Sequence, residues 1–217
     1  MATVDARPGP FTFDPATTAL VVIDMQRDFM EPGGFGETLG NDVSQLRRVI
    51  APTEALLRAC RATGLTVIHT REGHLPDLSD CPPAKLNRGE PSQRIGAPGP
   101  MGRILIRGEH GHDIIDELAP LPGEHQIEKY NYGAFHATML EPTLRALGVE
   151  SVVVTGTVTQ ICVEETARQA FHHGFRTTMV RDAVSSFAPD LHAATLKNFV
   201  SKFGWVEDST AVMRLLD

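Results

Sequence analysis

The sequence is poor in cysteine and in the larger aromatic residues, and it contains no long hydrophobic run. Three cysteines, one tryptophan and two tyrosines occur among its 217 residues. Cys60, Cys81 and Cys162 are odd in number, widely spaced and without a CxxC motif, which argues against a disulfide framework and against a structural zinc site. A reducing compartment fits this pattern best, and we expect a cytoplasmic protein.

Positive charge is also scarce. Lysine and arginine together number 20, against 27 aspartates and glutamates, and the formal net charge is -7. No basic stretch is dense enough to follow a phosphate backbone, so nucleic acid and anionic membranes are poor candidate partners. No segment approaches the roughly 18 apolar residues of a membrane span. The partner that the sequence favours is therefore a small molecule.

Length and patterning predict the fold class. With ordinary apolar and charged fractions, residues 1–217 are expected to form one domain with a continuous core. Predicted strands alternate with predicted helices, which indicates an α/β fold: a doubly wound, Rossmann-like parallel sheet of about six strands with helices on both faces. Strands are predicted at residues 18–24, 65–70, 126–129, 152–154, 176–182 and 205–207, and helices at 43–60, 113–118, 138–147, 162–171 and 190–201.

Two segments depart from this alternation. The proline-rich residues 1–17 are predicted to be an N-terminal arm over the surface. Residues 71–111, rich in glycine, proline and charge, form so long an excursion that we expect a cover over an active site or an oligomer contact. Pro52 either kinks the helix at 43–60 or begins a second one. Cys60 falls on the apolar stripe of that helix, whereas Cys81 precedes two prolines and is expected to be a bystander; neither is assigned a role.

Cys162 lies where a strand and a helix meet. The β-branched run at 152–154 is typical of a strand buried on both faces, and a helical pattern follows, with Gly174 in the place of a left-handed C-cap. If Thr159 is the N-cap, Cys162 lies in the first helical turn, where free N–H groups and the helix dipole favour a thiolate. A reactive nucleophile and a buried structural cysteine both remain open on this segment alone.

Two other predicted strands end in ionisable residues, Asp24 and Lys129. Parallel strands bring their carboxyl ends to one edge of the sheet, so these side chains and Cys162 are able to converge there. Taken singly, Asp24 suits a helix cap and Lys129 a surface ion pair. Together the three supply a thiol nucleophile, a carboxylate that accepts its proton and a cation, which is the minimal set for acyl transfer through a thioester.

Three segments that carry these residues, 22–29, 128–135 and 155–166, resemble the signatures of the isochorismatase-like cysteine hydrolases. The resemblance implies a doubly wound parallel sheet, a catalytic triad of Asp24, Lys129 and Cys162, and a homotetramer. It also implies a cis peptide bond between Thr157 and Val158, with the N–H groups of Val158 and Cys162 forming an oxyanion hole.

Within the family, residues 69–80, 92–96 and 99–109 resemble the biuret hydrolase branch, and residues 11–15 and 203–206 resemble ureidoacrylate amidohydrolases. Both branches cleave amide bonds in urea derivatives. Biuret or triuret is the substrate we expect, although Tyr130, Asn131 and Tyr132 replace the residues typical of biuret enzymes and no glutamine follows Ser185. The alternatives are a ureidoacrylate or N-carbamoyl amino acid amidohydrolase, an isochorismatase proper and, least favoured, a nonenzymatic thiol redox sensor.

Further site residues follow from the same resemblance. Substrate contacts are expected from residues in the loops after the first and third predicted strands: Gln26, Phe29, Phe35, Asn131, Tyr132 and Phe135. His69 with His74, or His110 with His112, resemble a metal-binding pair, but the Asp-Trp-His pattern of nicotinamidases is absent. We therefore expect neither a metal nor a cofactor.

Overall fold

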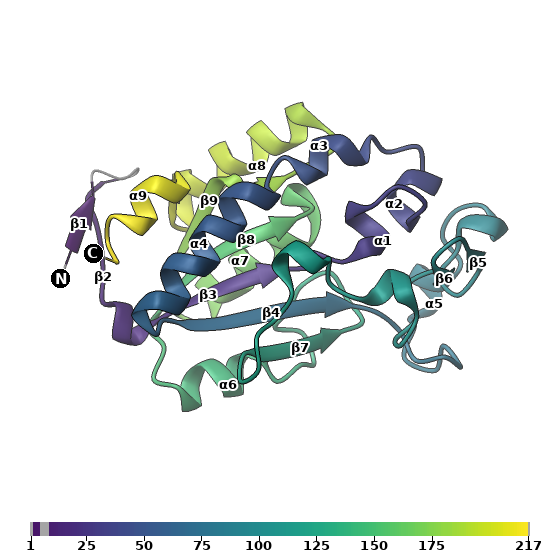
Figure 1. Cartoon of the computed structure of the whole chain (residues 1–217), viewed down its shortest axis with the longest axis horizontal. Coiled ribbons are helices and arrows are strands. Elements are labelled where there is room, and N and C mark those ends of the chain that lie inside the picture. The colour runs from purple at the N-terminus through teal and green to yellow at the C-terminus, as the bar shows by residue number, and fades with distance from the viewer. Residues whose placement is uncertain (1, 5–8, 217) are drawn as a thin grey trace.

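The computed structural model describes residues 2–4 and 9–216 and is built on one parallel sheet of six strands (Figure 1). The strand order across the sheet is β10-β9-β8-β3-β4-β7. In chain order the strands are β3 (Thr18–Ile23), β4 (Thr66–Glu72), β7 (His125–Lys129), β8 (Ser151–Thr157), β9 (Arg176–Ser185) and β10 (Trp205–Glu207). The predicted doubly wound parallel sheet is thus confirmed.

Helices cover both faces of the sheet, which explains why its central strands are apolar without alternation (Figure 1). In β3, Leu20 and Val22 belong to one core cluster, and Val21 and Ile23 belong to the other. The first cluster is closed by α3 (Val43–Arg47), α4 (Ile50–Thr63) and α9 (Ser209–Met213), and the second by α6 (Leu140–Ala146), α7 (Glu164–His172) and α8 (Pro189–Lys202).

Several predicted element boundaries are corrected. The helix expected at 43–60 is two helices, α3 and α4, with Pro52 in the first turn of α4, where its missing N–H costs little. The helix expected at 113–118 is a single 3-10 turn, Asp116–Leu118. The loop expected after the first predicted strand contains the short helices α1 (Arg27–Met30) and α2 (Phe35–Thr38). No helix in the described ranges is long and apolar enough to cross a bilayer.

The predicted N-terminal arm is more firmly attached than expected. Strand β1 (Ala2–Val4) pairs antiparallel with β2 (Phe11–Phe13), and a 3-10 turn, Pro15–Thr17, leads into β3. Phe13 is 1% exposed and packs in the core, and the indole N–H of Trp205 donates to the carbonyl of Gly9 at 3.2 Å. Residues 1 and 5–8 of the arm lie outside the described residues.

The long excursion begins two residues later than predicted, because β4 continues to Glu72. Residues 73–112, called here the covering segment, lie beyond the carboxyl ends of β3 and β4 (Figure 1). They hold α5 (Pro83–Leu86), two 3-10 turns (Pro91–Gln93 and His110–His112) and the small strands β5 (Pro98–Gly99) and β6 (Gly102–Arg103). The segment has its own apolar cluster, in which Cys81 is buried.

Gly156 permits the close approach of β8 and β3. It pairs with Ile23, has a φ of 113°, and a Cβ at this position would collide with the Ile23 carbonyl oxygen. We expect Gly156→Ala to lower the free energy of unfolding by about 2–4 kcal/mol. Urea unfolding is the measurement, with Gly108→Ala, where φ is also positive but space is open, as the matched control. Equal losses in both variants would contradict the collision.

Candidate active site

Asp24, Lys129 and Cys162 converge at the carboxyl edge of the sheet, as their positions in the sequence predict. Asp24 directly follows β3, Lys129 ends β7, and Cys162 lies in the π-helical turn Thr159–Val163 that follows β8. The Lys129 ammonium reaches past β4 to the Asp24 carboxylate, with Nζ 2.6 Å from Oδ2. Asp24 and Lys129 are wholly buried and Cys162 is 5% exposed, so these groups interact away from bulk water.

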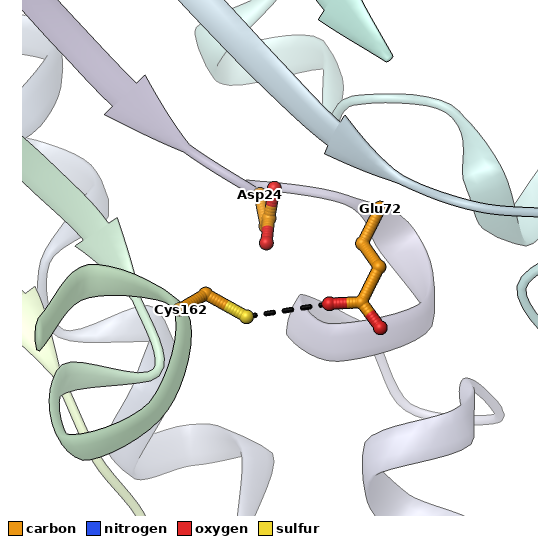
Figure 2. Close-up of side chains that lie close together, drawn as sticks. All are labelled: Asp24, Glu72 and Cys162. Atoms are coloured by element: carbon orange, nitrogen blue, oxygen red, sulfur yellow. Dashed lines mark hydrogen bonds between the residues drawn. The ribbon is translucent and has the colours of Figure 1, made fainter. Parts of the chain in front are cut away.

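A fourth residue, Glu72, joins them from the end of β4. Its Oε2 atom lies 3.2 Å from Lys129 Nζ and accepts a hydrogen bond from Cys162 Sγ at 3.3 Å (Figure 2). Its Oε1 atom lies 2.7 Å from Nζ of Lys85 in α5. Glu72 and Lys129 are partners in the β4–β7 register. Glu72 is not among the site residues predicted from the sequence, because the second predicted strand ends at Thr70. A strand two residues longer, as β4 is, places a third ionisable side chain at the same edge of the sheet.

Backbone and hydroxyl contacts fix the Asp24 and Lys129 side chains. Asp24 has a φ of 47°, and its N–H donates to the carbonyl and hydroxyl oxygens of Thr70, both at 3.2 Å. The Thr70 hydroxyl donates in turn to Asp24 Oδ1 at 2.6 Å. The Lys129 ammonium donates to the carbonyl of Asn131 at 2.9 Å in addition to its two carboxylates. All three of its protons therefore have an acceptor.

The two carboxylates differ in their electrostatic surroundings. Burial alone would raise the pKa of Glu72, but the charges of Lys129 and Lys85 outweigh it and hold that pKa at about 2. Burial also raises the pKa of Asp24, and there Lys129 is opposed by the nearby charge of Glu72, so the pKa stays above its ordinary value. Lys129 remains protonated because both carboxylates raise its pKa despite burial. Asp24 is thus the stronger base of the pair.

Cys162 rests as a thiol, which corrects the expectation that its position at a helix start favours a thiolate. Burial raises its pKa well above the ordinary value, and the charges of Glu72 and Asp24 add to this effect against the attraction of Lys129. Thr159 is not the N-cap: Val158 occupies that position, and the Thr159 hydroxyl lies 3.0 Å from Nδ1 of His192. Attack by this sulfur therefore requires a base at the moment of reaction.

A cavity of about 460 Å³ opens onto Glu72 and Cys162. The charged and polar groups in its wall include Lys85, Arg88 and Tyr132. Most of the remaining wall is apolar and comes from α1 to α3, the covering segment, the turn after β8 and the loop after β9: Phe29, Phe35, Leu39, Leu46, Ile95, Leu105, Val158, Ile161 and Phe187. The covering segment therefore helps to enclose the site; the oligomer contact stays a prediction.

The residues expected to contact substrate fall into two groups. Phe29, Phe35 and Tyr132 line the cavity, whereas Gln26, Asn131 and Phe135 are not in its lining. Gln26 is wholly buried: its Nε2 donates to the carbonyls of Glu72 and His112 at 2.9 and 3.0 Å, and its Oε1 accepts from the Glu72 N–H at 2.7 Å. Its amide thus fixes the Glu72 backbone instead of facing a ligand.

Asn131 and Phe135, also expected to contact substrate, make contacts within the protein instead. The part of Asn131 that reaches the site is its main-chain carbonyl, which accepts from Lys129. Phe135 is buried and stacks on His173 with a centroid distance of 4.9 Å. Its position therefore serves the packing of α7 against the sheet.

The candidate metal ligands among the histidines contact carboxylates instead. His69 Nε2 lies 3.0 Å from Glu124 Oε2, and His74 Nδ1 lies 3.3 Å from Asp80 Oδ1. Within residues 2–4 and 9–216, three donor atoms of the kind that bind metals come within 4.8 Å of one another at Asp24, Glu72 and Cys162. The Lys129 ammonium already contacts both of these carboxylates and supplies the positive charge there. That the site uses no metal stays a prediction.

The peptide bond between Thr157 and Val158 is cis, as the resemblance implied. Residues 18–211 match the family model of the isochorismatase domain. The chain belongs to the isochorismatase family. It is 36% identical over 211 residues to a ureidoacrylate amidohydrolase of Methylobacterium radiotolerans, an alignment that covers 95% of this chain and 82% of that protein. It is 34% identical over 206 residues to a ureidoacrylate amidohydrolase of Caulobacter vibrioides, covering 93% of this chain and 92% of that protein.

Solved structures of family members have the same fold. A cysteine hydrolase from Pseudomonas syringae pv. phaseolicola superimposes with a TM-score of 0.84 at 28% identity, covering 100% of this chain and 98% of that one. N-carbamoylsarcosine amidase from Thermoplasma acidophilum superimposes with a TM-score of 0.67 at 28% identity, covering 89% of this chain and 96% of that one.

Replacement of Lys129 should destabilise this isochorismatase-family protein in a pH-dependent way. Lys129→Met leaves two buried carboxylates with Lys85 as their nearest cation, and we expect a loss of about 3–5 kcal/mol at pH 7. Because the pKa of Glu72 is lowered, its ionised form stabilises the fold at pH values above 4.5, the ordinary pKa of a glutamate. This contribution disappears as pH falls toward about 2, the pKa of Glu72 in the folded protein. The loss in the variant should therefore shrink in acid.

Urea unfolding between pH 7 and pH 3 measures this difference. Lys197→Met is the matched control, because Lys197 is exposed on α8. A deficit for Lys129→Met that is the same at every pH would contradict the electrostatic origin.

Proposed function

We propose that the chain is a cysteine-dependent amidohydrolase that cleaves a C–N bond in a small urea derivative. The observation that carries the proposal is the contact of the Cys162 thiol with a buried cluster of two carboxylates and a lysine at the base of a cavity. A nucleophile, a base and a cation in contact form the minimal arrangement for acyl transfer. A redox sensor would not need Asp24 and Lys129 beside the sulfur, so this reading is disfavoured.

In the proposed reaction Asp24 takes the proton of Cys162, and Sγ bonds to the carbonyl carbon of the ureide. The carbonyl electrons move to oxygen, where the N–H groups of Val158 and Cys162 act as the oxyanion hole, a contribution of about 3–4 kcal/mol per donor. The carbon–nitrogen bond then breaks, and Asp24 returns its proton to the leaving nitrogen. Lys129 stays protonated throughout and balances the negative charge.

Water completes the cycle. Asp24 takes a proton from water as the oxygen attacks the thioester-like intermediate, the carbon–sulfur bond breaks, and the proton returns to Sγ. The raised pKa of Asp24 supports its role here, because a carboxylate with a higher pKa is a better acceptor for the proton of a thiol. Glu72, whose pKa is about 2, is a poor acceptor.

For the substrate we propose a ureide that carries a carboxylate, such as ureidoacrylate or an N-carbamoyl amino acid. Relatives 34–36% identical to this chain bear the name ureidoacrylate amidohydrolase, and a structural neighbour is an N-carbamoylsarcosine amidase. The size and largely apolar lining of the cavity suit a substrate with an organic body better than biuret, which is small and polar throughout. Biuret and triuret, favoured by residues 69–109, are the second candidates.

A substrate panel tests the proposal. Release of ammonia from ureidoacrylate, N-carbamoyl amino acids, biuret, triuret and nicotinamide should be highest for a carboxylated ureide. Cys162→Ala should lose at least about 10³-fold in kcat while its thermal unfolding stays close to that of the wild type. Mass spectrometry should detect a covalent adduct on Cys162, which a thiol-independent isochorismatase reaction would not form. Ureide hydrolysis by Cys162→Ala at the wild-type rate would overturn the proposal.

Arg88 is the residue we expect to select the carboxylate. It lines the cavity, lies close enough to the Tyr132 hydroxyl to act on its pKa, and makes no ion pair with any described residue, unlike Lys85, which is paired with Glu72. Arg88→Gln should raise KM for ureidoacrylate about tenfold, because a charge-assisted contact is lost, and leave KM for biuret within about twofold. Arg214→Gln, an exposed arginine close to the last residue of the chain and outside the cavity lining, is the control. Parallel changes in both KM values would contradict this assignment.

A further inference from the structure

We propose that Glu72 is a substrate-binding residue that accepts a hydrogen bond from a ureide N–H, and that Lys85 of the covering segment keeps it ionised for this purpose. The inference rests on the proposed amidohydrolase function and assigns a task to Glu72 and Lys85, an ion pair at the site that the mechanism above does not use. It divides the work of the two carboxylates at the site: Asp24 moves protons, and Glu72 holds the substrate.

The geometry places Glu72 where an N–H of the substrate must lie. Its Oε2 atom is 3.3 Å from Sγ, and both residues line the cavity (Figure 2). A carbonyl carbon that Sγ attacks lies about 3–3.5 Å from the sulfur, and in a ureide this carbon is flanked by two nitrogens. A carboxylate is an acceptor only, so it matches N–H donors and offers nothing to an ester or ether oxygen. The resting S–H···O contact is thus exchanged for N–H···O when a ureide binds.

The charges around Glu72 fit an acceptor that never takes the proton. Lys85 contacts Oε1 at 2.7 Å and Lys129 contacts Oε2 at 3.2 Å, whereas Asp24 has Lys129 alone. A carboxylate held between two ammonium groups keeps its negative charge. The remaining ionisable groups that act on Glu72 or are acted on by it are Asp24, His74, Cys81, Tyr132 and Cys162.

Lys85 makes this recognition depend on the covering segment. Its Nζ donates to the carbonyl of Tyr130 at 2.6 Å, lies 5.0 Å from the centre of the Tyr132 ring, and its side chain is 9% exposed. The lysine therefore ties α5 to the loop after β7 and to Glu72 at once. A covering segment that is out of place would leave the catalytic groups intact but remove the second cation from Glu72.

The first experiment compares Glu72→Gln with the wild type on a carboxylated ureide and on two analogues methylated at one or the other ureide nitrogen. Glutamine keeps the shape but loses the charge, so KM for the parent ureide should rise about tenfold. Methylation of the nitrogen that contacts Glu72 should cost the wild type about tenfold in kcat/KM and cost the variant less than about twofold. Glu90→Gln, an exposed carboxylate of the same segment, is the control and should behave as the wild type.

The pH dependence separates this role from that of a base. In Glu72→Gln the acid limb of kcat/KM should persist, since Asp24 sets it, and should move to lower pH, because the lost Glu72 charge no longer raises the pKa of Asp24. In Lys85→Met the pKa of Glu72 rises, so KM should increase as pH falls, whereas KM of the wild type stays flat. Lys85→Met also keeps the inference testable if Glu72→Gln proves unstable in thermal unfolding.

The outcomes distinguish this inference from the proposed function. If the wild type hydrolyses no ureide, both the proposed function and this inference are wrong. If ureides are hydrolysed, but Glu72→Gln lowers kcat, removes the acid limb and leaves KM unchanged, Glu72 is the base and the inference is wrong. Equal sensitivity of the variant and the wild type to methylation at both nitrogens also overturns it.

Discussion

The site depends on one buried ammonium group, that of Lys129. Its three protons are shared among the Asp24 carboxylate, the Glu72 carboxylate and the Asn131 carbonyl. Two carboxylates this close would not both remain ionised away from water without a cation between them. Lys129 therefore permits the arrangement from which the rest of the chemistry follows: a base and an acceptor, both negative, beside one thiol.

The parallel sheet makes this arrangement possible. Asp24, Glu72 and Lys129 end or follow three adjacent strands, β3, β4 and β7, and β8 leads into the turn that holds Cys162. Because parallel strands finish at one edge, residues that lie far apart along the chain arrive within hydrogen-bonding distance. Both faces of the sheet are covered by helices, so its carboxyl edge is left as the place for a cavity.

The covering segment changes the electrostatic character of the site. Without Lys85 the site would hold two carboxylates and one ammonium group. With it the charges of the four ionised residues cancel, and Glu72 rather than Asp24 becomes the carboxylate with two cations. This asymmetry turns two similar side chains into a stronger and a weaker proton acceptor. The same segment supplies Arg88 and the apolar wall residues Ile95 and Leu105, so charge balance and part of the substrate fit depend on one piece of chain.

The sequence by itself determined the sheet, the family and the convergence of Asp24, Lys129 and Cys162, because apolar runs, strand-end residues and short motifs are local features. It did not reveal that Glu72 belongs to the site, that the Gln26 amide binds the main chain of Glu72, or that Cys162 is a thiol at rest. Each of these depends on distances between residues on different strands and on burial, which only the folded chain defines. The local sequence pattern predicts that a side chain lies at the end of a strand. The tertiary structure determines which groups surround that side chain, and these groups set its pKa and therefore its charge.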